Sequence, residues 1–141
     1  MSYISAFDPS ADKKRNLASK IYDISESVTK FFWDDAPRLG IQQREGQQDM
    51  AFDVLDAIKS GSHVVIEAGV GIGKSFAYLM PILLYNSKTF HPVVIATSTI
   101  ALQEQLLSDM ELLKKWLRLD PDLILAKGLS LIHISEPTRP Y

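Results

Sequence analysis

The sequence AGVGIGKS, at residues 68–75, decides the fold class that we expect for this chain. It follows the apolar run HVVIE at 63–67 and precedes FAYLMPILLY at 76–85. A glycine-rich turn between a buried strand and a helix is the setting of a phosphate-binding loop. Gly71 and Gly73 would let the backbone wrap closely round a phosphate, and the N-terminus of the next helix would face the anion.

The residue pattern of this loop is [Ala/Gly]-x-x-x-x-Gly-Lys-[Ser/Thr], with Ala68 at its start. At its end, Lys74 is placed to reach the β- and γ-phosphates as the catalytic lysine, and the Ser75 hydroxyl to ligate Mg²⁺. The alternative is an ordinary glycine-rich turn, which the strand-then-helix context disfavours. We predict a nucleotide site made of Ala68, Gly69, Val70, Gly71, Ile72, Gly73, Lys74 and Ser75.

Three short apolar runs, at 63–68, 92–97 and 123–127, are continuous rather than alternating. Continuous hydrophobicity is typical of strands that are buried on both faces of a parallel sheet. Helical patterns at 74–86 and 100–117 separate the runs. The order strand, helix, strand, helix, strand predicts an α/β fold with parallel strands and flanking helices.

The N-terminal part of the chain is expected to be helical. Apolar residues recur at spacings of three or four between residues 11 and 32, which predicts an amphipathic helix. The segment 31–43 mixes aromatics with proline and glycine, and we interpret it as a loop. A second helix is predicted over 47–59, with Gly61 ending it in a left-handed cap.

Composition excludes several classes of protein. The chain has 141 residues, a net charge of −2 and no cysteine, so it offers neither a basic nucleic-acid footprint nor a thiolate metal site. Its three histidines are too scattered to suggest a zinc site. It shows neither the apolar run of roughly 18 residues that a membrane span needs nor a secretory signal. A cytoplasmic location is therefore expected.

The tail LSLIHISEPTRPY, at 129–141, fits no element that begins upstream. One possible coding sequence for it resembles the transposon-end adaptor of sequencing libraries, read in frame. We predict that this tail is non-native and that the gene continues past Gly128, which would make the chain an N-terminal fragment. The alternative is a genuine polar tail.

Three segments carry a family resemblance: REGQQDM (44–50), IEAGVGIGKSFAYLMP (66–81) and VVIATSTIALQEQLL (93–107). In order and spacing they resemble successive motifs of the DinG/XPD-like branch of superfamily 2 ATP-dependent DNA helicases. The resemblance implies a partial RecA-like P-loop domain, the helicase ATP-binding domain, at 39–128. An N-terminal helical extension would occupy 1–38, before this domain and the tail.

The same resemblance implies roles for residues outside the phosphate loop. Arg44 and Gln47 would help to recognise adenine, whereas their sequence context alone favours a solvated helix start. Val70 and Ile72 replace the hydroxyl residues that are usual in the family, although backbone N–H groups do most of the phosphate binding. Residues near the single-stranded DNA path would be Thr97, Ser98, Thr99 and Gln103, where helix capping is the compatible local alternative.

By resemblance, the full-length protein is expected to be an ATP-dependent DNA helicase that uses ATP and Mg²⁺ to move on single-stranded DNA. After the phosphate loop the chain contains no DEAH-type acidic motif, so we expect the fragment itself to be inactive. An iron–sulfur cluster is possible only in the missing part, and no membrane or protein partner is inferred. Two alternatives stay open: another P-loop NTPase, such as a loader or partition ATPase, or a non-catalytic nucleotide-binding module.

Overall fold

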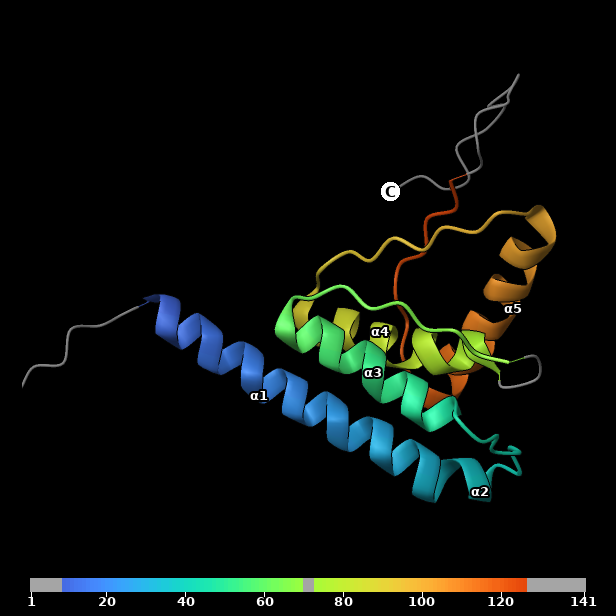
Figure 1. The fold of residues 1–141 in the computed structure, drawn as a ribbon, viewed down its shortest axis with the longest axis horizontal. Coiled ribbons are helices and arrows are strands. Elements are labelled where there is room, and N and C mark those ends of the chain that lie inside the picture. Colours follow the sequence, from blue (N-terminus) through green and yellow to red (C-terminus); the bar gives the residue numbers. More distant parts are fainter. Residues whose placement is uncertain (1–8, 70–72, 127–141) are drawn as a thin grey trace, which may run out of the picture.

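The computed structural model describes residues 9–69 and 73–126, and all regular secondary structure in these ranges is helical (Figure 1). Four longer helices account for most of it, and a π-helical turn, η1, continues the first of them. In chain order the elements are α1 (Pro9–Lys30), η1 (Phe31–Asp35), α2 (Ala36–Arg38), α3 (Gln47–Ser60), α4 (Lys74–Thr89) and α5 (Ile100–Leu117).

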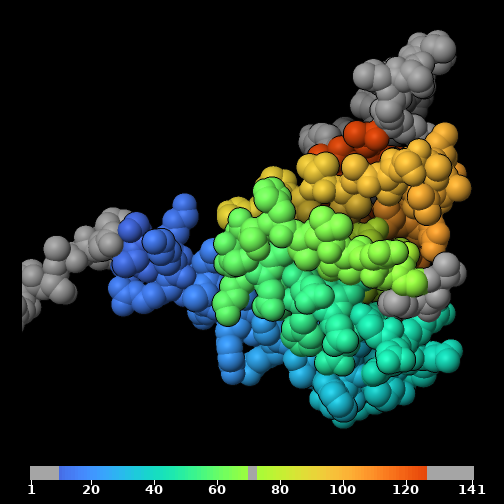
Figure 2. Space-filling view, in the orientation of Figure 1, coloured from blue at the N-terminus to red at the C-terminus, as the bar shows by residue number. Residues whose placement is uncertain are grey.

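The helix predicted from the periodicity of the N-terminal sequence is present, and helical structure continues further along the chain than expected. Its apolar face buries Ile21, Ile24 and Val28. Instead of a loop at 31–43, the chain continues through η1, whose Phe31 and Phe32 are buried, and through α2. The loop prediction was therefore wrong for 31–38, because these aromatic residues reach the core when the helix continues. The first turns of α1 project beyond the rest of the molecule (Figure 2).

The core lies where α4 packs against α3, α1 and α5. The helices predicted over 47–59, 74–86 and 100–117 are all present, and Gly61 ends α3 in the predicted left-handed conformation. Buried apolar side chains of these helices form one cluster with those of α1 and η1. Its fully buried large members include Ile24, Val28, Leu55, Leu79, Met80 and Leu113.

The predicted parallel sheet is not formed, so the α/β fold class was wrong for this structure. No strand forms at 63–68, at 92–97 or in the described part of the third run, 123–126. No backbone hydrogen bond between described residues joins any two of these runs. Val65 is 97% exposed and Val94 is 91% exposed. A strand needs a neighbouring backbone about 4.8 Å away to bond its N–H and C=O groups, and these runs have none in the described chain.

None of the helices in the described ranges combines the length and apolar character that crossing a membrane requires.

Candidate nucleotide site

The predicted phosphate loop reaches helix α4 through Gly73. Gly73 has a φ of 75°, in the left-handed region that favours glycine. It precedes Lys74, which is exposed, and Ser75, which is half-buried in the first turn of α4. Gly73 has no side chain to cap the helix, so the first N–H groups of α4 have no capping side chain there. The predicted contacts of Val70, Gly71 and Ile72 lie outside the described residues.

Gln47 supports this loop from the start of α3. This residue is 8% exposed, and its Nε2 donates a hydrogen bond to the Gly73 carbonyl at 3.1 Å. A Cβ atom added to Gly73 would collide with the same Nε2 atom. The amide of Gln47 therefore binds the backbone at the end of the predicted phosphate loop. Sequence reasoning assigned Gln47 to adenine and did not find this contact, because the two residues are 26 positions apart.

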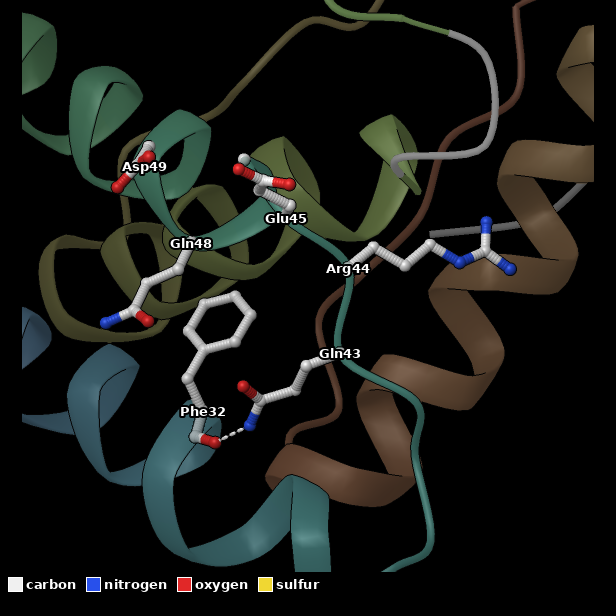
Figure 3. A pocket seen from close by; sticks show the side chains of 7 residues that line it. Phe32, Gln43, Arg44, Glu45, Gln48 and Asp49 are labelled. Carbon is white, nitrogen blue, oxygen red and sulfur yellow. Dashed lines mark hydrogen bonds between the residues drawn. The ribbon is translucent and has the colours of Figure 1, made fainter.

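Arg44, the other residue assigned to adenine, lines a cleft of about 260 Å³ between η1 and α3. The Phe32 ring points into this cleft, and the Gln43 amide donates a hydrogen bond to the Phe32 carbonyl (Figure 3). Gln47 does not line it. An aromatic ring among polar side chains is a common composition for a small-molecule site. The full lining is Phe32, Gln43, Arg44, Glu45, Gly46, Gln48 and Asp49.

A second cleft of about 260 Å³ lies beside Ser75. Thr97 and Ser98, both predicted DNA contacts, line it together with Ser75 and Tyr78 of α4. The structure thus brings the segment before α5 next to the start of α4. The remaining lining residues are Ala96, Leu102, Gln105 and Leu106.

The other two predicted DNA contacts do not line this cleft. Thr99 is the N-cap of α5, where its side-chain oxygen accepts a hydrogen bond from the Leu102 N–H at 3.2 Å. The local capping role is therefore present. Gln103 lies in the first turn of α5 and is half-buried.

A polar cluster joins α4 to α5 at the second cleft. The Ser75 hydroxyl lies near the side chains of Tyr78 and Asp109. Burial raises the pKa of the Asp109 carboxyl, and the nearby Ser75 hydroxyl opposes that rise. Burial also raises the pKa of Tyr78, with Ser75 again opposing and the charge of Asp109 adding to the rise. Within the described ranges, no group of three or more His, Cys, Asp or Glu side chains could hold a metal ion.

A family model for DEAD/DEAH box helicases matches residues 46–131, which is more than half of the chain. The chain belongs to the DEAD/DEAH box helicase family. The match begins one residue before Gln47. It therefore covers the helices α3, α4 and α5 and the loop that precedes α4. Lys74 offers an exposed positive charge and Ser75 offers a hydroxyl at the start of α4, and both suit a magnesium–nucleotide complex.

Several curated relatives place the chain within a DinG-like group of this helicase family. It is 45% identical to the ATP-dependent helicase DinG of Mycobacterium tuberculosis over 83 residues, which is 59% of this chain and 12% of that protein. It is 42% identical to the ATP-dependent DNA helicase YoaA of Escherichia coli over 92 residues, 64% of this chain and 14% of that protein. It also matches the 3'-5' exonuclease DinG of Bacillus subtilis, at 42% identity over 69 residues, 49% of this chain and 7% of that protein. No solved structure matches the chain.

Proposed function

We propose that this chain is the ATP-binding part of a DinG-like DNA helicase that couples ATP hydrolysis to movement along single-stranded DNA. The hydrogen bond from Gln47 to the Gly73 carbonyl is the observation that carries the proposal. It joins the segment that lines the Arg44 cleft to the end of the phosphate loop. If a base binds in that cleft and the phosphates bind at the start of α4, this hydrogen bond would connect the two parts of the nucleotide site.

The chain's own residues would hold the nucleotide in three ways. Backbone N–H groups at the start of α4 would bind phosphate oxygens, and the helix dipole would favour the negative charge. The Lys74 ammonium would bind the terminal phosphates, and the Ser75 hydroxyl would ligate the metal. Magnesium, when bound, neutralises charge on the phosphate oxygens.

The contact with DNA is proposed for the second cleft. Thr97 and Ser98 are exposed and lie beside Ser75, so a strand bound there would be next to the nucleotide. Hydroxyl groups of this kind commonly bond phosphate oxygens of nucleic acids. Thr99 would contribute mainly by capping α5, and Gln103 would contribute from its first turn. A cytoplasmic location is part of this proposal.

We further propose that the 141-residue chain does not hydrolyse ATP at a useful rate. Phosphoryl transfer needs a carboxylate that holds Mg²⁺ and positions the attacking water. Four acidic residues that follow the loop, Glu104, Glu111, Asp120 and Asp122, are exposed on or after α5. Glu111 and Asp120 are paired with Lys114, each at 3.3 Å.

Removal of the Lys74 charge tests the nucleotide site. Lys74→Ala should weaken ATP binding in the presence of Mg²⁺ at least about tenfold, because a hydrogen bond to a charged group is worth roughly 1.5–3 kcal/mol. Isothermal titration calorimetry on the purified chain measures this effect. Lys88→Ala is the matched control, since Lys88 is an exposed lysine in the last turn of the same helix.

Two outcomes of these measurements would contradict parts of the proposal. Equal binding by the wild type and Lys74→Ala would contradict the phosphate-loop assignment. DNA-stimulated ATP turnover by the chain, if Lys74→Ala abolished it, would support ATP use but contradict the proposed inactivity.

A further inference from the structure

The second cleft, which lies beside Ser75, has a lining that does not suit a phosphate group. Its lining residues, all within the part of the chain that the structure describes, include no charged side chain. Leu102 and Leu106 of α5 form part of the wall, and Leu106 is 8% exposed. A phosphate that entered the cleft would lose water without meeting the lysine or arginine that usually binds it. The cleft therefore suits a neutral ligand.

The same lining offers both an aromatic surface and hydrogen-bonding groups. Tyr78 of α4 is half-buried and contributes its ring. Gln105 of α5 is exposed and contributes an amide, which can both donate and accept hydrogen bonds. A nucleobase has the matching form, because its faces stack on aromatic rings and its edges form hydrogen bonds. The proposed function gives neither Tyr78 nor Gln105 a role.

The volume of the cleft also limits its ligand. At about 260 Å³ it is smaller than the roughly 300–1,000 Å³ of sites that hold drug-sized molecules. One base is a single flat ring system, whereas a whole nucleoside triphosphate is much larger. A single base is therefore the part of a nucleic acid that matches both the size and the uncharged lining of the cleft.

We propose that the second cleft binds one unstacked base of single-stranded DNA, with Tyr78 as its stacking surface and Gln105 hydrogen-bonded to its edge. The inference rests on the proposed function, which places DNA at this cleft, and it names the part of the strand that enters. The exposed hydroxyls of Thr97 and Ser98 remain available to phosphate oxygens of the same strand. Stacking on one ring accepts every base, so this contact needs no particular DNA sequence.

Two oligonucleotides with the same phosphates test the inference on the 141-residue chain. One is a fluorescent oligo(dT), and the other is an abasic oligonucleotide of equal length. Their dissociation constants are measured by fluorescence anisotropy at one fixed salt concentration. We expect the wild type to bind oligo(dT) at least about fivefold more tightly, which is the lower end of the gain from stacking one base.

Four variants assign this preference to the cleft. Tyr78→Ala should lose most of the preference for oligo(dT), whereas Tyr78→Phe keeps the ring and should recover it. Gln105→Ala should reduce the preference about two- to tenfold, as loss of one hydrogen bond predicts. Tyr22→Ala is the matched control, since Tyr22 is 64% exposed on α1 and does not line the cleft. Circular dichroism reports whether each variant folds.

A crosslinking experiment locates the base without any substitution. The wild-type chain is irradiated with an oligo(dT) that carries one 5-iodouracil, which crosslinks to an aromatic side chain on which it stacks. Mass spectrometry of the digested product should find the crosslink on the peptide that contains Tyr78. A crosslink confined to other peptides would overturn the inference, even if Tyr78→Ala did not fold.

The remaining outcomes separate this inference from the proposed function. Equal binding of the two oligonucleotides by the wild type would overturn the inference and leave the proposed DNA contact standing. A folded Tyr78→Ala variant that kept the full preference for oligo(dT) would do the same. If the wild-type chain bound neither oligonucleotide, the DNA contact of the proposed function and the inference would both fall.

Discussion

At Gly73, both the backbone conformation and a tertiary contact favour a residue without a side chain. Its φ of 75° suits glycine, and its missing side chain leaves room for the Gln47 amide. Gly73→Ala should lower the free energy of unfolding by about 2–4 kcal/mol. Roughly 1–2 kcal/mol comes from left-handed strain and the rest from displacing a buried hydrogen-bonding group. Urea denaturation followed by circular dichroism measures the loss.

Gly61 provides the matched comparison for this prediction. It has a φ of 65° at the end of α3, but no atom lies within 4 Å of a Cβ built there. Gly61→Ala should therefore cost only the conformational part, about 1–2 kcal/mol. The excess cost at Gly73 should shrink when Gln47 is also changed to Ala. Equal losses at the two glycines would show that the Gln47 contact is not rigid.

At the scale of the helices, Trp116 connects three elements that are distant in sequence. Its ring stacks on Phe76 of α4 with centroids 5.5 Å apart, and it lies 6.0 Å from Phe31 of η1. Trp116→Leu should lower the free energy of unfolding by about 2–3 kcal/mol, because it removes aromatic packing at the core edge. Urea unfolding followed by circular dichroism is suitable, since the change removes one of the two tryptophans.

The other tryptophan is the control for the aromatic contact. Trp33 lies in η1 and is 69% exposed. Trp33→Leu should change the free energy of unfolding by less than about 0.5 kcal/mol, as most exposed substitutions do. A loss as large as that of Trp116→Leu would mean that the Trp116 stack does not hold α5 against η1 and α4.

At the scale of the whole molecule, the apolar runs outside the helical core expose surface that a folded chain normally covers. Val65 and Val94 in these runs are strongly exposed, as is Phe90 at the end of α4. Large exposed apolar patches favour association. We expect the chain to self-associate with rising concentration at about 10–100 μM, where exposed apolar surface promotes aggregation. Sedimentation velocity over a concentration series measures the average size.

Two substitutions test whether these runs cause the association. Val65→Thr and Val94→Thr keep the side-chain shape but add a hydroxyl, and together they should shift the series toward monomer. Their effect on the free energy of unfolding should stay within about 0.5 kcal/mol, because both sites are exposed. A wild-type chain that stays monomeric across the series would contradict the prediction.

Local sequence information was sufficient for the four longer helices of this protein and for its family, but not for η1 and α2. A helix bonds its own backbone groups, so the spacing of apolar residues predicted α1, α3, α4 and α5. Local signals also placed the end of α3 at Gly61 and the start of α5 after Thr99. The phosphate-loop pattern and its two neighbouring motifs pointed to the helicase family that the family model then matched.

Tertiary structure decided everything that needs a partner from elsewhere in the chain. The apolar runs did not form strands, because strands depend on a second backbone for their hydrogen bonds. The hydrogen bond from Gln47 joins the start of α3 to Gly73, the residue directly before α4. Sequence spacing carries no information about such pairs. The packing of α3 against α4 brings such residues together, and α5 packs against the same helix.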